Sequence, residues 1–161
     1  MAKVARLNHA VLYVRDAAAS AEFYRRVFGF EVVSEEFGGR AVFLRAAGGE
    51  NHHDLGLFSV GDDAPRPPRG ATGLYHLAWE VLTIEELATT AGELQAAGGL
   101  TGASDHGVSK SLYGRDPDGI EFEVMWRVPA AFWGEYEQRG AVMPLDLDAE
   151  IRRWGAGTAT A

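Results

Sequence analysis

Five histidines are the residues of this chain best suited to bind a metal ion or to move a proton, because the sequence has no cysteine. Without thiolates, a metal would have to be held by His, Asp and Glu. His9 and His76 each come two residues after a leucine, and they lie 67 residues apart. Each could be an ordinary strand histidine hydrogen-bonded to a neighbour, but the matched pair favours a shared site.

A carboxylate near the end of the last apolar segment could complete a ligand set. In this segment Ile120, Phe122 and Val124 alternate with Glu121 and Glu123, so the two acids share one face of a predicted strand. A buried acid needs a partner, and a metal ion is such a partner, although both acids could instead line a solvated face. Two histidines and one carboxylate form the facial triad of non-haem Fe(II) oxygenases, which leaves positions open for O2 and substrate.

Composition and charge limit the kinds of partner that the chain can have. It has 161 residues, of which 47% are hydrophobic, enough for one ordinary globular domain. There are 23 acidic against 15 basic residues and no basic cluster, which argues against nucleic acid as a partner. No apolar run approaches the roughly 20 residues of a membrane span, and residues 1–7 lack the apolar core of a signal peptide. We therefore expect a cytoplasmic protein with no membrane partner.

The first half of the chain predicts a βαβββ order of elements around His9. Residues 7–14 have strand character, and Asp16 then opens a helix over 17–28 that ends at Gly29. Three further strands are predicted at 31–36, 40–46 and 53–60, separated by glycine pairs.

The second half repeats this order after a Pro- and Gly-rich linker at 61–72. It predicts a strand at 74–81, a helix at 84–97 and strands near 107–108, 111–115 and 120–126. The prediction is an α+β domain over residues 1–127. Its two βαβββ modules, about 5–60 and 73–127, would pair into a curved mixed sheet that encloses a metal site.

A C-terminal extension, residues 128–161, lies outside the repeat. It predicts a short helix at 149–154 with acids at its start and Arg152 and Arg153 at its end, as the helix dipole favours. Residues 155–161 are expected to be disordered. Nothing in the extension suggests chemistry by itself.

Three motifs give the chain a resemblance to the vicinal oxygen chelate superfamily, which contains glyoxalases, bleomycin-resistance proteins and type I extradiol dioxygenases. They are the His9-to-Asp16 segment, the Phe23-Tyr24-x-x-Val27-Phe28-Gly29-Phe30 helix end and Asp116-Pro117-Asp118-Gly119 before Glu123. The resemblance covers roughly residues 6–127. Further segments resemble single-domain proteins like catechol 2,3-dioxygenase: His52-His53-Asp54, Leu74-Tyr75-His76, and Asp105-His106-Gly107 with Tyr113.

The resemblance implies an extradiol dioxygenase that uses Fe(II), or Mn(II), and O2 to cleave a catechol-type aromatic ring. It also implies a homodimer. Histidine, with a pKa near neutrality, suits the removal of a phenolic proton. The residues implied are His9, His76 and Glu123 as metal ligands, His53 as the group acting on the proton or dioxygen, and His106 and Tyr113 as contacts to substrate oxygens.

Two other activities remain open. A glyoxalase-like isomerase or lyase would need a fourth protein ligand, and the position 67 residues before Glu123 is Gly56, with Asp54 two residues away. A metal-free binding or resistance protein would have no need of three convergent ligands.

The chain also departs from the family pattern at one position. It has Ile120 where relatives often carry Asn or His, so we expect a polar contact near the last strand to be missing.

Overall fold

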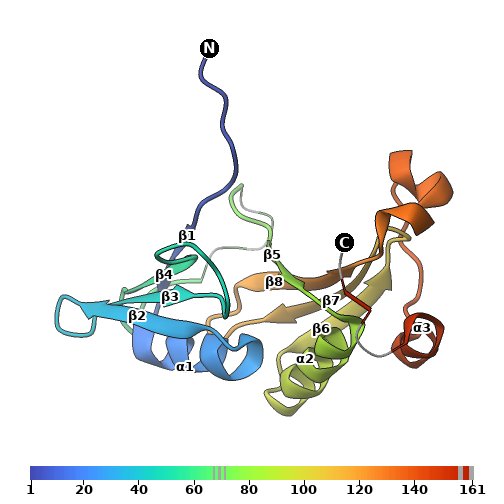
Figure 1. Ribbon diagram of the computed structural model, residues 1–161. Coiled ribbons are helices and arrows are strands. Elements are labelled where there is room, and N and C mark those ends of the chain that lie inside the picture. Colours follow the sequence, from blue (N-terminus) through green and yellow to red (C-terminus); the bar gives the residue numbers. More distant parts are fainter. Residues whose placement is uncertain (67, 69, 71, 156–157, 160–161) are drawn as a thin grey trace. The chain divides into compact units, whose positions relative to one another are not determined.

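The computed structural model describes residues 1–66, 68, 70, 72–155 and 158–159, and it divides into two compact units, Met1–Arg69 and Gly70–Ala161 (Figure 1). Residues 67, 69 and 71 of the predicted linker lie outside the described residues. So do residues 156, 157, 160 and 161 of the end predicted to be disordered.

The N-terminal unit is a four-stranded mixed sheet with one helix on one face (Figure 1). The strand order is β1-β4-β3-β2, with β1 parallel to β4 and the other neighbours antiparallel. The buried side chains of the helix and of β3 and β4 form its core. Its elements are β1 (Ala10–Val14), α1 (Ala17–Phe28), β2 (Glu31–Glu36), β3 (Ala41–Arg45) and β4 (Leu55–Ser59).

The C-terminal unit repeats this arrangement and adds an extension. Its strand order, β5-β8-β7-β6, has the same parallel pair followed by antiparallel neighbours. The predicted α+β fold with two βαβββ modules is therefore confirmed. The elements are β5 (Leu77–Val81), α2 (Ile84–Ala96), β6 (Leu100–Asp105), β7 (Ser109–Arg115), β8 (Glu121–Arg127), the 3-10 helices η1 (Ala130–Phe132) and η2 (Gly134–Gln138), and α3 (Leu147–Trp154).

Both modules begin their main helix with a side-chain cap at the same place in the repeat. The Asp16 carboxylate accepts hydrogen bonds from the first-turn backbone of α1, and Thr83 forms a capping box with Glu86 in α2. The two caps are 67 residues apart, like His9 and His76. No helix in the described part of the chain is long and apolar enough to cross a membrane.

Three local predictions need correction. The strand predicted near 107–108 is wrong: Gly107 has a φ of 78° and lies in the turn after β6, whose small, polar side chains give no apolar alternation. Helix α3 begins at Leu147 rather than Ala149, because the Asp146 side chain caps it. Within the end predicted to be disordered, Ala159 forms an isolated antiparallel bridge with Thr83.

Candidate metal and substrate site

Two of the three predicted metal ligands meet in the C-terminal unit. His76 stands directly before β5 and Glu123 lies in β8, which runs parallel to β5 and pairs Ala78 with Glu123. The Nε2 atom of His76 is 3.3 Å from Oε2 of Glu123, and their side chains are 26% and 13% exposed. The strand pairing thus brings an imidazole and a carboxylate together in a partly buried position.

The chemistry of this pair fits a divalent cation. Imidazole nitrogen and carboxylate oxygen are both ligands that Fe(II), Mn(II) and Zn(II) accept. The Nδ1 atom of His76 is buried and has no hydrogen-bond partner among the described residues. Among the described residues, no group of three or more His, Asp or Glu side chains that could hold a metal ion is present.

His9, the third predicted ligand, lies directly before β1 in the N-terminal unit and is exposed. Its Nδ1 atom is 2.9 Å from Oδ1 of Asn8, and the Asn8 amide nitrogen donates to Asn51 Oδ1 at 3.2 Å. Because an amide oxygen only accepts, Nδ1 carries the proton and the Nε2 lone pair of His9 stays available. This arrangement leaves His9 able to bind a metal ion, and the triad remains a prediction.

Both carboxylate oxygens of Asp54 already accept hydrogen bonds from residues of the first module. Its Oδ1 accepts a hydrogen bond from Asn51 Nδ2 at 2.7 Å, and its Oδ2 accepts from the Ala46 backbone N–H at 2.8 Å. Asn51 also donates to the Asn8 backbone carbonyl, at 3.0 Å. Asp54 therefore holds Asn51 in the position from which it hydrogen-bonds Asn8, and the Asn8 side chain in turn contacts His9.

The place in the first module that corresponds to Glu123 holds a glycine. Gly56 pairs with Val11 across β4 and β1, as Glu123 pairs with Ala78 across β8 and β5. A Cβ atom at position 56 would lie 3.3 Å from the Phe43 ring. The space that a carboxylate would need is thus filled by Phe43.

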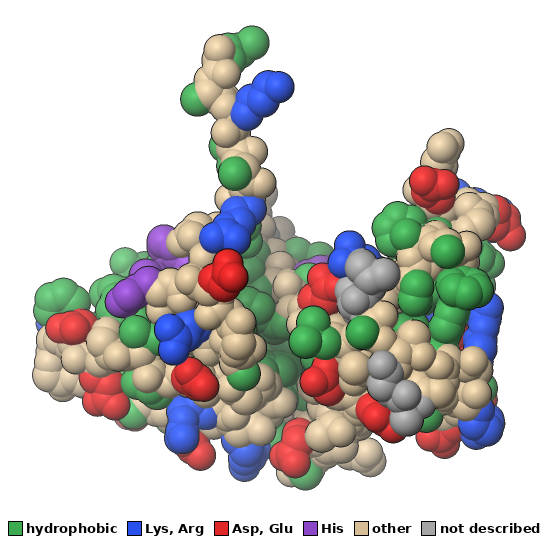
Figure 2. Space-filling view, viewed as in Figure 1, with side chains coloured by type: hydrophobic (Ala, Val, Ile, Leu, Met, Phe, Trp, Pro, Cys, Tyr) green, Lys and Arg blue, Asp and Glu red, His purple; other side chains and the backbone are tan. Residues whose placement is uncertain are grey.

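His53 lies beside His9 in the N-terminal unit. The two ring centroids are 4.6 Å apart, and the Nδ1 atoms of His52 and His53 are 3.1 Å apart. Partial burial and, after it, the charges of His9 and His52 lower the pKa of His53 below 6.5, against the opposing charge of Asp54. The neutral imidazole, the form that accepts a proton, is thereby favoured. Histidine side chains are visible at the surface of this unit in Figure 2.

His106 and Tyr113, the remaining predicted residues, are hydrogen-bonded to each other in the C-terminal unit. His106 Nε2 is 2.8 Å from the Tyr113 hydroxyl, and its Nδ1 is 2.6 Å from the carbonyl oxygen of Ala141. Tyr113 pairs with Glu123 across β7 and β8, and its ring centroid is 6.1 Å from that of His76. Burial and, after it, the charge of Glu123 raise the pKa of Tyr113 above 10.0, so the hydroxyl keeps its proton.

The structure thus forms two groups of predicted site residues, His9 with His53 in one unit and four residues in the other. Sequence reasoning missed Ala141, because a backbone carbonyl leaves no side-chain signal. It also missed Lys110, which is 3% exposed with its Nζ 2.6 Å from Asp105 Oδ2, although a lysine directly before a predicted strand is such a signal. The four residues of the C-terminal group are His76, His106, Tyr113 and Glu123.

The chain belongs to the Glyoxalase/Bleomycin resistance protein/Dioxygenase superfamily, whose family model matches residues 6–124. A solved structure of a glyoxylase/bleomycin resistance protein/dioxygenase domain from Frankia sp. EAN1pec superposes with a TM-score of 0.62 at 22% identity. The match covers 78% of this chain and 100% of that one. This likeness shows the fold.

Two curated relatives carry dioxygenase names. A catechol-2,3-dioxygenase of Bacillus subtilis (strain 168) is 30% identical over 156 residues, which are 92% of this chain and 52% of that protein. A manganese-dependent 2,3-dihydroxybiphenyl 1,2-dioxygenase of Geobacillus genomosp. 3 is 29% identical over 131 residues, 79% of this chain and 38% of that protein. The chain thus spans about half, or less, of the length of these relatives.

Proposed function

We propose that the chain is a metal-dependent extradiol dioxygenase that cleaves a catechol-type ring beside its two hydroxyls, with Fe(II) or Mn(II) held by His9, His76 and Glu123. The proposal is supported by the His76–Glu123 pair, by the free Nε2 of His9 and by the dioxygenase relatives. The substrates would be a small aromatic diol and O2.

The observation that carries the proposal is the difference between Gly56 and Glu123. These residues occupy the same register position in the two modules, yet only the second position supplies a carboxylate. Asp54, the other acid near Gly56, is engaged by Asn51 and Ala46. Three protein ligands leave more open positions on the metal than four, which suits an oxygenase better than a glyoxalase-like isomerase.

The other residues of the site have roles that suit a phenolic substrate. The lowered pKa of His53 favours the neutral imidazole, which can accept a phenolic proton and later return it. The predicted contacts of His106 and Tyr113 to the substrate would be made through the Tyr113 oxygen, which donates its proton to His106 and can accept a hydrogen bond from a substrate hydroxyl. A divalent metal held by His9, His76 and Glu123 would supply open coordination positions and redox chemistry for the reaction of the diol with O2.

The test is an oxygen electrode and a visible spectrum on protein loaded anaerobically with Fe(II), over a panel of substituted catechols. We expect uptake of one O2 per ring and a coloured ring-opened product. The variant Glu123→Ala, loaded in the same way, is the control and should take up no oxygen. No uptake with any catechol by protein shown to be iron-loaded, together with turnover of a hemithioacetal, would assign the chain to the glyoxalase class instead.

A further inference from the structure

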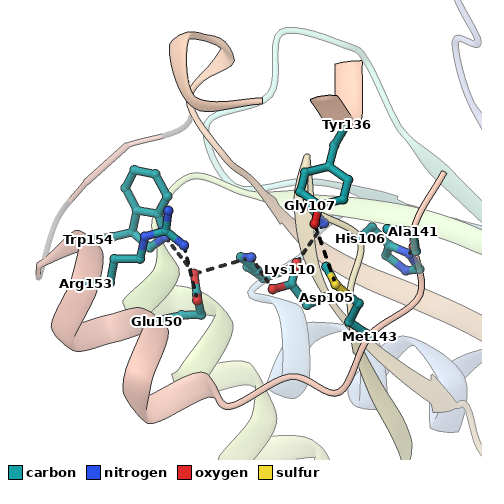
Figure 3. A network of polar contacts seen from close by, with 10 residues as sticks. All are labelled: Asp105, His106, Gly107, Lys110, Tyr136, Ala141, Met143, Glu150, Arg153 and Trp154. Carbon is teal, nitrogen blue, oxygen red and sulfur yellow. Dashed lines mark hydrogen bonds and ion pairs between the residues drawn. The ribbon is translucent and has the colours of Figure 1, made fainter. Parts of the chain in front are cut away.

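The turn that carries His106 is enclosed by the C-terminal extension, within one unit (Figure 3). Asp105 and Met143 exchange both of their backbone hydrogen bonds, each at 2.9 Å. Tyr136 packs directly on the turn, because a Cβ atom at Gly107 would overlap its ring. Ala141 places its carbonyl against His106. The extension thus contacts the turn at three successive residues, 105 to 107.

A buried lysine ties the turn to helix α3. Lys110 is 3% exposed, and its Nζ is 2.6 Å from Asp105 Oδ2 and 3.4 Å from Glu150 Oε2 (Figure 3). The other oxygen of Asp105 accepts the Gly107 N–H at 2.7 Å, inside the turn. Glu150 is itself held by Trp154 Nε1 at 2.8 Å. These contacts form a continuous polar path from α3 to the His106 turn.

The first module shows that the hairpin folds without this path. Ala41 pairs with Glu36 across β3 and β2, as Lys110 pairs with Asp105 across β7 and β6. Position 37 therefore corresponds to position 106, and Phe37 is 66% exposed. The corresponding residue of the first module is Ala41, so the hairpin can form without a lysine at this position. Lys110 is therefore expected to have a role other than forming the hairpin.

The contact with Ala141 fixes the tautomer of His106. A backbone carbonyl can only accept, so Nδ1 of His106 must carry a proton. In the neutral imidazole, Nε2 is then unprotonated and accepts the Tyr113 O–H. The Tyr113 oxygen consequently offers its lone pairs, rather than its proton, to any third group.

We propose that the C-terminal extension is a positioning element for the site and that Lys110 is its positioning residue. By joining Asp105 to Glu150, Lys110 keeps the Ala141 carbonyl against Nδ1 of His106 and so selects a single tautomer. In the proposed dioxygenase, on which this functional consequence rests, Tyr113 is thereby set to accept a hydrogen bond from a substrate hydroxyl.

The first measurement is the tautomer itself, read from long-range ¹H–¹⁵N correlations of the His106 ring in the full, metal-free chain at mildly alkaline pH. The variants are Lys110→Met, Lys110→Arg, which keeps the charge, and Glu150→Gln, a milder change. The control is Glu135→Gln, which breaks the exposed pair with Arg139 in the same extension. Thermal unfolding of each variant shows whether it is folded.

We expect the Nδ1–H tautomer alone in the parent chain, in Lys110→Arg and in Glu135→Gln, and a mixture of tautomers in Lys110→Met and Glu150→Gln. If Lys110→Met does not fold, Glu150→Gln decides. An Nε2–H tautomer in the parent chain, or an unchanged single tautomer in a folded Lys110→Met or Glu150→Gln, would overturn the proposal.

Measurements of turnover distinguish the positioning role of Lys110 from the proposed dioxygenase activity. If the chain is a dioxygenase, Lys110→Met should lower kcat about 10-fold at unchanged metal content, because displaced groups lose the reacting geometry. Lys110→Arg should restore most of it. A folded Lys110→Met with mixed tautomers and full kcat would overturn the positioning role. If no catechol is turned over by the parent chain, the proposed function fails, while the tautomer measurement still decides what Lys110 does.

Discussion

The two modules share one scaffold and differ in the side chains that the scaffold presents. The parallel strand pair, the helix cap and the hairpin recur at matched places in both. At matched register positions, however, the first module has Phe43 opposite Gly56, whereas the second has Tyr113 opposite Glu123. The repeated backbone thus fixes where side chains lie, and residue identity at a few positions decides which module carries a carboxylate on its last strand.

The modules also differ in what surrounds their first hairpin. In the first module Phe37 is exposed at the turn, with a φ of 54°. In the second module the turn is covered by Tyr136 and bonded to Ala141 and Met143. The extension thus adds contacts to this turn in the second module, whereas the first module's turn residue Phe37 is exposed.

The largest effect should come from removing the carboxylate that distinguishes the two modules. Glu123→Ala should weaken Fe(II) or Mn(II) binding by more than the roughly 10- to 100-fold that loss of an outer-shell partner costs. The matched control is Glu121→Ala on the same strand, where Glu121 pairs with Arg115. Metal content after dialysis measures both. Equal metal content in the two variants would remove Glu123 from the ligand set.

The second prediction distinguishes two neighbouring histidines of the first module. His53→Gln should lower kcat by about 10²- to 10⁴-fold, the usual contribution of a general acid or base, with metal content unchanged. His52→Gln should leave kcat within about 3-fold, because His52 is exposed and lowers the pKa of His53 less than burial and His9 do. Steady-state oxygen uptake with paired metal analysis gives both values. The reverse result would make His52 the proton-transfer group.

The third prediction compares the two hairpin turns through one substitution. Gly38 and Gly107 both have a positive φ, 67° and 78°, so alanine strains the backbone equally in each, by about 1–2 kcal/mol. Position 38 has open space, whereas a Cβ at 107 would meet Tyr136. Gly107→Ala should therefore cost about 1–3 kcal/mol more than Gly38→Ala in urea unfolding. Equal losses would mean that Tyr136 does not hold the turn.

Much of the scaffold could be predicted from sequence because its signals are local. Asp16 and Gly29 bound α1 as expected, and the apolar alternation of 120–126 located β8. Strand β6 was misplaced, since its residues are small and lie at the sheet edge, where no apolar face is required. The matched histidines and the alternating acids predicted a site that contains His76 and Glu123, and these two side chains do lie 3.3 Å apart.

The parts that could not be predicted depend on contacts between distant segments. The bond from His106 to Ala141 joins residues 35 positions apart through a backbone atom. The engagement of Asp54 by Asn51 and Ala46 is likewise set by the loop conformation rather than by a motif. This engagement is what argues against Asp54 as a fourth metal ligand, which sequence alone left open.

The smallest expected effect is that of adding a side chain at Gly56, the position where the first module lacks the carboxylate of the second. A Cβ at Gly56 would lie 3.3 Å from Phe43 and 3.4 Å from Val11, closer than side chains normally pack. Because φ at Gly56 is not positive, alanine there adds no backbone strain, and it restricts the unfolded chain, a gain of about 0.4–1 kcal/mol. The tight packing should outweigh this gain, so Gly56→Ala should lower the free energy of unfolding by about 1 kcal/mol.

A double-mutant cycle isolates the Phe43 contact. In a Phe43→Leu background, Gly56→Ala should become neutral or stabilising, with a coupling energy of about 0.5–3 kcal/mol between the two sites. Gly102→Ala is the control, because its Cβ would meet only Tyr113, at an ordinary 3.9 Å. Urea unfolding of the four chains gives the cycle. A coupling near zero would show that Phe43 does not exclude side chains from position 56, and the absence of a carboxylate there would need another cause.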